Sequence, residues 1–328
     1  MDTGVYVRYN LKRNGIYRKN MRINQKLRWA LVLSGGGAKG LAHIGIIKAL
    51  MEKGYPEPSL IVGTSMGAIV GGLYASGMGI QEMARFVLEE FDITQYLDSF
   101  VFKLNGPVGK ILQAGQIVGT LTGKPGMDSG NHALALIERL AGCKNFEETR
   151  IPFRCNAVDI VSGEEVVFRS GNLARAIRAS MSFPLFFEPL TEGEMSLVDG
   201  GLADNMPVRI AGEEGFRHIL AVEVGAFKTR PIRDFDTAPK VVYRSLEVVL
   251  NLIRSQAGKD HPALVIKAAH DNATPLSFEK KWELVALGEQ AVRENEKALA
   301  VFFGSGLRAS MARRFYRKSR GGWYAKTE

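Results

Sequence analysis

The sequence predicts an α/β protein with three layers, in which helices cover both faces of a mostly parallel central sheet. Two observations lead to this prediction. Short apolar runs typical of buried strands alternate with longer stretches of helical periodicity along most of the chain. The 328 residues, of which 46% are hydrophobic and 23% charged, can also bury one large core. We therefore expect one catalytic domain with appendages.

The individual elements follow from these patterns. Strands are predicted at 29–34, 59–63, 153–159, 165–169, 196–199, 218–224 and 263–267. Helices are predicted at 41–53, 65–76, 80–91, 131–141, 172–181, 240–257 and 279–301. Gly54 and Gly77 end the first two helices, because glycine readily adopts the left-handed conformation that follows a helix. The residues around Ser162-Gly163 indicate a hairpin between two of the strands.

Charge divides the chain into three parts. Residues 1–28 form a basic N-terminal arm of net charge +7, and residues 307–328 form a basic C-terminal tail of net charge +6. Because the whole chain carries +9, the predicted catalytic domain at 29–306 has a net charge of −4. The C-terminal tail mixes its cations with aromatic residues, which favours contact with an anionic membrane over binding to nucleic acid, with a solvated tail as the open alternative.

Residues 105–130 break the alternation of strands and helices. This stretch holds seven glycines and two prolines, interleaved with aliphatic residues. It is either a surface connection or a lid that receives acyl chains.

The most informative motif is Gly63-Thr64-Ser65-Met66-Gly67, which follows the apolar run 60–62 and precedes a helix. A serine with glycine two positions away on each side suits a sharp turn from strand to helix, because neither glycine carries a Cβ that would obstruct it. Ser65 is therefore the candidate nucleophile, whereas a plain helix-capping serine is the structural alternative.

A glycine-rich loop precedes this turn by about one strand and one helix. The run Ser34-Gly35-Gly36-Gly37-Ala38-Lys39-Gly40 lies between a predicted strand and a predicted helix. A dinucleotide site is excluded because the next strand ends in 63–65 without an acidic residue, and a Walker loop is excluded because glycine follows Lys39. The loop therefore predicts an oxyanion hole built from the N–H groups of Gly35, Gly36 and Gly37, together with the N–H of Met66.

Asp199 supplies the third component. It ends the predicted strand 196–199 and is followed by Gly200 and Gly201. An Asp-Gly pair alone is usually a turn, but at the end of a strand it can reach the edge of the sheet where ligands bind. Asp199 is therefore the candidate base.

These three motifs together resemble the patatin-like phospholipases. The segment 179–189, Ala-Ser-Met-Ser-Phe-Pro-Leu-Phe-Phe-Glu-Pro, is also similar to the stretch that this family carries before its aspartate. The resemblance covers roughly residues 29–225. It implies hydrolysis of lipid or lysophospholipid acyl esters by a Ser65/Asp199 dyad without a histidine, with Gly35, Gly36 and Gly37 in the oxyanion hole. The family more often has arginine where this chain has Lys39, which keeps the charge but loses the bidentate fork.

Two other functions remain open on the sequence. An α/β-hydrolase with a Ser-His-Asp triad would need a histidine after Asp199, and the chain offers His218, His261 and His270. A weakly catalytic lipid-binding or regulatory protein is the non-enzymatic alternative.

No metal site or organic cofactor is implied. Cys143 and Cys155 lack metal-ligand spacing and are interpreted as reduced, buried thiols. His43 is interpreted as a helix-face histidine packed on the sheet, with a place in the lining of the site as the alternative. No run of eighteen apolar residues and no apolar leader is present, so we expect a cytoplasmic protein that the basic tails could hold at the inner face of the membrane. Head group, chain length, calcium response and oligomeric state are not encoded in these motifs.

Overall fold

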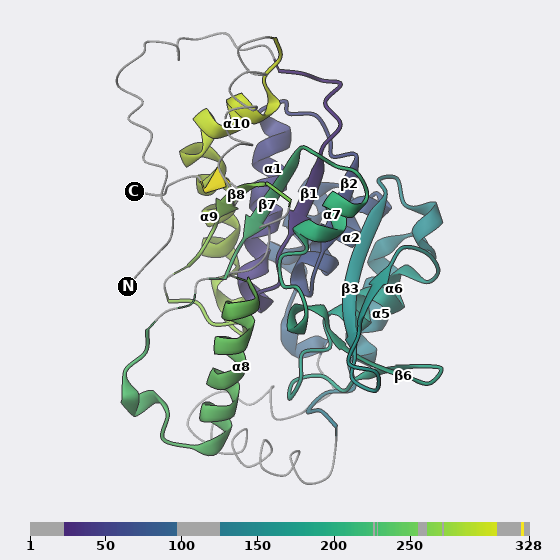
Figure 1. The fold of residues 1–328 in the computed structure, drawn as a ribbon, viewed down its shortest axis with the longest axis vertical. Coiled ribbons are helices and arrows are strands. Elements are labelled where there is room, and N and C mark those ends of the chain that lie inside the picture. Colours follow the sequence, from purple (N-terminus) through teal and green to yellow (C-terminus); the bar gives the residue numbers. More distant parts are fainter. Residues whose placement is uncertain are drawn as a thin grey trace.

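The computed structural model describes residues 23–96, 125–225, 227, 229–254, 261–270, 272–306 and 323–324. A central sheet of nine strands runs in the order β5-β6-β3-β2-β1-β7-β8-β9, with β4 paired to β3 (Figure 1). The strands are β1 (Ala30–Leu33), β2 (Leu60–Gly63), β3 (Phe153–Asp159), β4 (Glu165–Phe168), β5 (Leu190–Glu192), β6 (Met195–Asp199), β7 (Ile219–Glu223), β8 (Leu264–Lys267) and β9 (Trp323–Tyr324).

The sheet is parallel from β3 through β2, β1, β7 and β8 to β9. The hairpin predicted at residues 162–163 is present, since β4 pairs antiparallel to β3. Strand β6 is also antiparallel to β3, with Asp199 opposite Ala157. Asp199 is thus the last residue of a strand that is antiparallel to its neighbour β3. It lies near the carboxyl end of β3, where the parallel strands also end. The expectation of a mostly parallel sheet is confirmed, and the antiparallel pairs are those that β4, β5 and β6 form.

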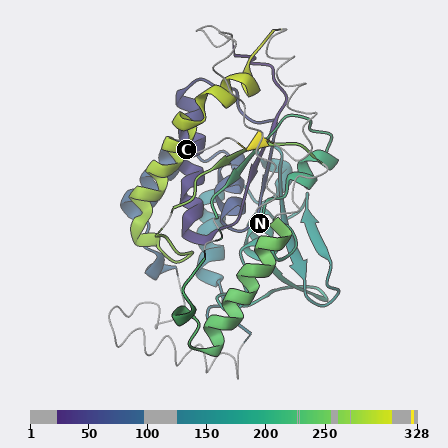
Figure 2. The ribbon, with the colours of Figure 1, turned by 60° about the vertical axis from the view of Figure 1, so that its left-hand side comes forward.

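The helices are α1 (Ala42–Glu52), α2 (Met66–Ser76), α3 (Ile80–Arg85), α5 (Asn131–Ala141), α6 (Leu173–Ser180), α7 (Val208–Glu213), α8 (Ala238–Arg254), α9 (Lys281–Glu294) and α10 (Glu296–Phe303). Alternate residues of the central strands face two separate cores. Leu31 and Leu33 pack into the larger core with α1, α2, α3, α6 and α9, whereas Ala30 and Val32 face the smaller core, which α7 covers. The three layers are therefore unequal. Figure 2 shows α8 extending at one end of the molecule, away from the sheet.

Most predicted elements are present, with three kinds of difference. The helix predicted at 279–301 is divided at Asn295, whose side-chain Nδ2 donates to the Ala291 carbonyl at 2.8 Å. The helix predicted at 80–91 ends in a π-helical turn at Phe86–Glu90. The short elements β5, α7 and β9 were not expected. They contain three, six and two residues, which is too few to show a recognisable periodicity.

Several expectations fall partly or wholly outside the described residues. These are the lid predicted at 105–130, of which residues 125–130 are described, the N-terminal arm up to residue 22 and most of the C-terminal tail. Cys143 and Cys155 are free thiols, of which Cys155 is buried and Cys143 is only partly so. None of the helices in the described ranges combines the length and apolar character that a membrane crossing requires.

Candidate active site

Ser65 occupies the sharp turn between β2 and α2. Its backbone has φ 55° and ψ −121°, a conformation that a residue with a side chain rarely adopts. The flanking glycines make the turn possible by close approach: a Cβ on Gly67 would lie 2.2 Å from the Leu33 carbonyl oxygen, and one on Gly63 would lie 2.3 Å from the Gly67 carbonyl oxygen. The sequence motif is therefore a structural requirement for holding Ser65 in this strained position.

A second serine accepts a hydrogen bond from the turn. The backbone N–H of Ser65 donates to Oγ of Ser180 at 3.0 Å, and Ser180 is fully buried in α6. Ser180 lies in the segment that we singled out for its resemblance, but a role for its hydroxyl was not predicted. This hydrogen bond joins the segment 179–189 to the turn that carries Ser65.

The glycine-rich loop lies beside Ser65. The Gly35 N–H donates to the Asn205 carbonyl at 3.1 Å, and the Ala38 N–H donates to the Pro275 carbonyl at 2.7 Å. Gly37 has φ 57° and backs onto Pro275, so closely that a Cβ there would lie 2.4 Å from the Pro275 carbonyl oxygen. These contacts fix the loop at both ends.

Three N–H groups remain near Ser65 without a hydrogen-bond acceptor among the described residues. They belong to Gly36, Gly37 and Met66, all of which line the cavity described below. The expectation that Gly35 also offers a donor has to be corrected, because its N–H is already bonded to Asn205. Gly35 instead positions the loop.

Asp199 is buried, with 2% of its surface exposed. Its Oδ1 accepts the Gly201 N–H at 2.7 Å, whereas Oδ2 accepts no well-aligned hydrogen bond from the described residues. Burial raises the pKa of Asp199 to about 6, although the nearby Ser65 hydroxyl and the Gly201 N–H both act to lower it. The carboxyl is therefore poised to exchange a proton near neutral pH, next to the Ser65 hydroxyl.

Asn156 joins the two halves of the site, a role that was not predicted from the sequence. It is fully buried on β3, the strand between β2 and β6. Its Oδ1 accepts the Thr64 hydroxyl at 2.7 Å, and its Nδ2 donates to the Gly200 carbonyl at 3.2 Å. One amide thus connects the residue before Ser65 with the residue after Asp199.

None of the five histidines lines the cavity. His270 pairs with Glu283 at 3.1 Å, and the ring of His218 packs edge-on against Phe302 at a centroid distance of 6.2 Å. His261 packs against Gly212. Burial lowers the pKa of His43 to about 4, and its Nε2 hydrogen-bonds the Ser34 carbonyl at 2.8 Å, so His43 is a neutral residue of the core, as expected.

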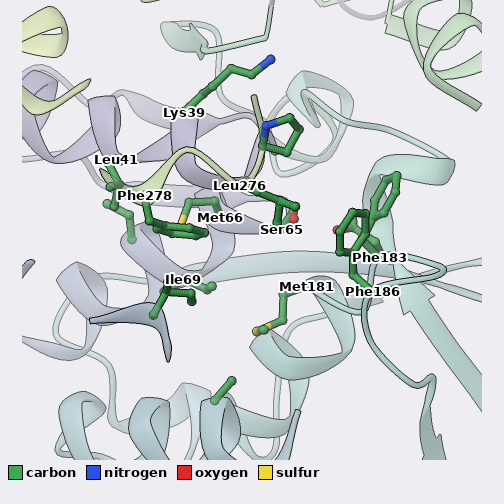
Figure 3. Close-up of a pocket in the computed structure, with 18 of the residues that line it drawn as sticks. Lys39, Leu41, Ser65, Met66, Ile69, Met181, Phe183, Phe186, Leu276 and Phe278 are labelled. Atoms are coloured by element: carbon green, nitrogen blue, oxygen red, sulfur yellow. The ribbon is translucent and has the colours of Figure 1, made fainter. Parts of the chain in front are cut away.

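A cavity of about 690 Å³ opens over Ser65 (Figure 3). Met66, Ile69, Met181, Phe183, Phe186 and Phe278 surround it, so that Ser65 presents its hydroxyl to a largely apolar wall. Asp199, Gly36 and Gly37 also line it. Space of this volume and character fits an aliphatic chain.

The remaining motif residues have supporting positions. Gly201 lines the cavity, and a Cβ on Gly200 would lie 2.3 Å from the Asn156 carbonyl oxygen. A Cβ on Gly40 would lie 2.4 Å from Cγ of Met66, so Gly40 lets the loop pack against the turn. Lys39 lines the cavity at its rim, and in Figure 3 its side chain extends away from Ser65.

Comparison with known proteins decides the family. Residues 31–211 match the sequence model of the family described as patatin-like phospholipase. The chain belongs to the patatin-like phospholipase family. The matched range contains Ser65, Asp199 and the glycine-rich loop, which confirms the resemblance stated on the motifs.

This patatin-like protein spans only part of the length of the curated relatives that it matches. The lysophospholipase NTE1 of Debaryomyces hansenii is 32% identical over 223 residues, which cover 63% of this chain and 12% of that protein. An uncharacterized NTE family protein of Mycobacterium bovis is 33% identical over 209 residues, covering 63% of this chain and 52% of that protein. Among solved structures, VipD from Legionella pneumophila aligns with a TM-score of 0.47 and 18% identity, over 83% of this chain and 67% of that one.

Proposed function

We propose that the protein is a serine acyl-ester hydrolase that cleaves lipid or lysophospholipid esters through a Ser65/Asp199 dyad. Asp199 accepts the proton of the Ser65 hydroxyl as Ser65 Oγ attacks the acyl carbonyl. The N–H groups of Gly36, Gly37 and Met66 stabilise the negative charge on the carbonyl oxygen. Asp199 then passes the proton to the departing alcohol, and a water molecule hydrolyses the acyl-serine by the same steps.

One observation carries this proposal: Ser65 is held in a strained turn in the wall of an apolar cavity, beside a buried carboxyl whose pKa is raised to about 6. A base of that pKa is ionised at neutral pH, yet is basic enough to accept a proton in the transition state. The dyad therefore needs no imidazole. The absence of histidine from the cavity wall speaks against the Ser-His-Asp alternative.

The cavity supports an acyl chain as the group that is bound. Its wall is formed mainly by aliphatic, methionine and phenylalanine side chains, which match a hydrocarbon chain and offer few partners to a polar head group. The yeast relatives bear the name lysophospholipase, which points to a single-chain phospholipid as the first substrate to test. The dyad argues against a purely lipid-binding protein, and no metal or organic cofactor takes part in the proposed steps.

The test is the release of fatty acid from a lysophospholipid. Purified protein is incubated with lysophosphatidylcholine, and both products are measured by mass spectrometry. We expect fatty acid and glycerophosphocholine in equal amounts, and neither product with the Ser65→Ala variant. Equal release by wild type and Ser65→Ala would refute the proposal. Failure of wild type to release fatty acid from any lipid ester would favour the lipid-binding alternative.

A further inference from the structure

Exposed apolar side chains are concentrated in one part of the molecule. The described residues include twelve large apolar side chains that are substantially exposed, and nine of them lie between residues 227 and 282. Phe227 and Leu276 also line the cavity, at 39% and 51% exposure. They mark its mouth. Trp282, 60% exposed, is the second residue of α9 and follows the cavity residue Phe278 by four positions.

Helix α8 contributes most of this surface. Five of its residues are between 38% and 60% exposed: Val241, Val242, Val248, Val249 and Leu252. Their spacing of seven, eight and eleven positions places them on one face of the helix, which we call the α8 stripe. Ser245 lies within the stripe, but its Oγ donates to the Val241 carbonyl at 2.9 Å. The stripe therefore presents no unsatisfied side-chain polar group.

The opposite face of α8 belongs to the active-site cavity. Glu247, Leu250 and Asn251 line the cavity from this helix. Arg244 stands 4.0 Å over the ring of Phe227 and pairs with Glu247 at 3.0 Å, which ties the helix to the mouth. Helix α8 thus has the α8 stripe on one face and the cavity on the other. Figures 1 and 2 both show α8 extending beyond the sheet at one end of the molecule.

The charge of this region differs from that of the domain around it. Residues 227–254 carry six Lys or Arg against three Asp or Glu, whereas residues 29–306 together have a net charge of −4. A net positive segment with an apolar stripe and a nearby exposed tryptophan has the composition of helices that lie in the interface of anionic membranes.

We propose that the α8 stripe is the surface by which the protein lies on an anionic phospholipid bilayer, with the cavity mouth beside it. The inference rests on the proposed lipid hydrolysis and adds how substrate is reached: the stripe enters the interface, and an acyl chain passes from the bilayer into the cavity past Phe227 and Leu276. Valines and a leucine supply apolar area, while the net positive charge of residues 227–254 favours anionic head groups.

The test measures binding separately from turnover. Vesicles of phosphatidylcholine with phosphatidylglycerol are sedimented with protein that carries Ser65→Ala, so that no lipid is consumed. Adding Val249→Asp and Leu252→Asp should lower the vesicle partition coefficient at least tenfold, because each substitution places a charge where the proposal has an apolar side chain entering the bilayer. The milder pair Val249→Ser and Leu252→Ser should give an intermediate loss. Circular dichroism checks that each variant is folded.

The matched control uses the two exposed apolar residues of the β3–β4 turn, Ile160 and Val161, which are 54% and 70% exposed. Changing both to Asp should leave the partition coefficient within twofold. In protein with Ser65 intact, the stripe variant should hydrolyse a water-soluble ester at the wild-type rate and vesicle lipid much more slowly. Measurements at high salt suppress any contribution of the basic tails, so the difference that remains reports on the stripe.

Three outcomes would overturn the proposal. The first is an aspartate variant of the stripe that binds vesicles as strongly as the protein with an unchanged stripe. The second is an Ile160/Val161 control whose partition coefficient falls as much as that of the stripe variant. The third is a wild-type dimer in light scattering that the stripe substitutions dissociate, since the stripe would then be an interface between two copies. If the stripe binds vesicles as expected but wild type hydrolyses no ester, only the proposed enzymatic function fails.

Discussion

The raised pKa of Asp199 leads to opposite predictions for activity and for stability. If Asp199 has to be ionised to accept the Ser65 proton, kcat/KM should fall tenfold per pH unit below about pH 6, and Asp199→Asn should lose about as much activity as Ser65→Ala. For stability the sign is reversed, because burial favours the neutral carboxyl. The folded protein binds more protons than the unfolded chain between pH 3.8 and about 6, so stability is lost as pH rises through this window.

The size of the effect follows from the same pKa. The difference between an ordinary pKa of 3.8 and about 6 corresponds to about 3 kcal/mol of lost stability above pH 6. Asparagine keeps an oxygen for the Gly201 N–H but cannot ionise. We therefore expect Asp199→Asn to raise Tm by roughly 5 °C at pH 8 and by little at pH 4, which is close to the lower limit of this window, so that wild type has lost little stability there.

Two assays test this reasoning. Thermal unfolding of wild type and Asp199→Asn is followed from pH 4 to 8, and hydrolysis of p-nitrophenyl butyrate is followed over the same range at an isosbestic wavelength. Asp204 provides the matched control, since burial and nearby Glu165 raise its pKa to about 6 as well, yet it does not line the cavity. Asp204→Asn should change the pH dependence of stability and leave the inflection in kcat/KM. An activity profile flat down to pH 4, or an Asp199→Asn variant less stable than wild type at pH 8, would contradict the reasoning.

Three further predictions concern the loop, the histidines and the tail. A Cβ on Gly36 would lie 2.7 Å from Cγ2 of Val224, so Gly36→Ala should displace the loop and lower kcat on the order of a hundredfold. Adding Val224→Ala to Gly36→Ala should restore part of the lost kcat. A double variant with no higher kcat than Gly36→Ala would show that the collision with Val224 is not the cause of the loss. Replacing any one of the three histidines after Asp199 with Gln should leave kcat within about tenfold, whereas a thousandfold loss in the same ester assay would favour a triad. Deleting residues 307–328 removes a net charge of +6, so it should reduce low-salt sedimentation with phosphatidylglycerol vesicles while soluble-ester turnover stays the same; unchanged sedimentation would show that the tail does not bind lipid.

Local patterns in the sequence were sufficient to identify the three segments that line the cavity together, namely the turn at Ser65, the glycine-rich loop and the end of β6. The turn at Ser65 depends on the glycines at 63 and 67. A Cβ on Gly63 would collide with the first turn of α2, and a Cβ on Gly67 would collide with the backbone at the end of β1. Continuous apolar runs predicted the central strands, because side chains at successive positions enter two different cores and both cores are apolar.

Contacts between distant segments could not be predicted in the same way. Asn156 looks like an ordinary polar residue in a strand, and its importance depends on β3 lying between β2 and β6, which is a matter of strand order. The bond from Gly35 to Asn205 likewise joins residues 170 positions apart, so the sequence predicted one donor too many in the loop. The cavity and the α8 stripe also require the assembled fold, because they are defined by which faces of the helices remain uncovered.

The central claim is that Ser65 is a nucleophile activated by Asp199. Reaction with a fluorophosphonate, followed by intact-protein mass spectrometry and peptide mapping, measures this directly, because the reagent phosphonylates activated serines far faster than ordinary ones. We expect one adduct per chain on the peptide that contains Ser65, no adduct with Ser65→Ala, and labelling slowed on the order of a thousandfold in Asp199→Asn. Folded wild-type protein that remains unlabelled, or Ser65→Ala labelled at the wild-type rate, would contradict the account.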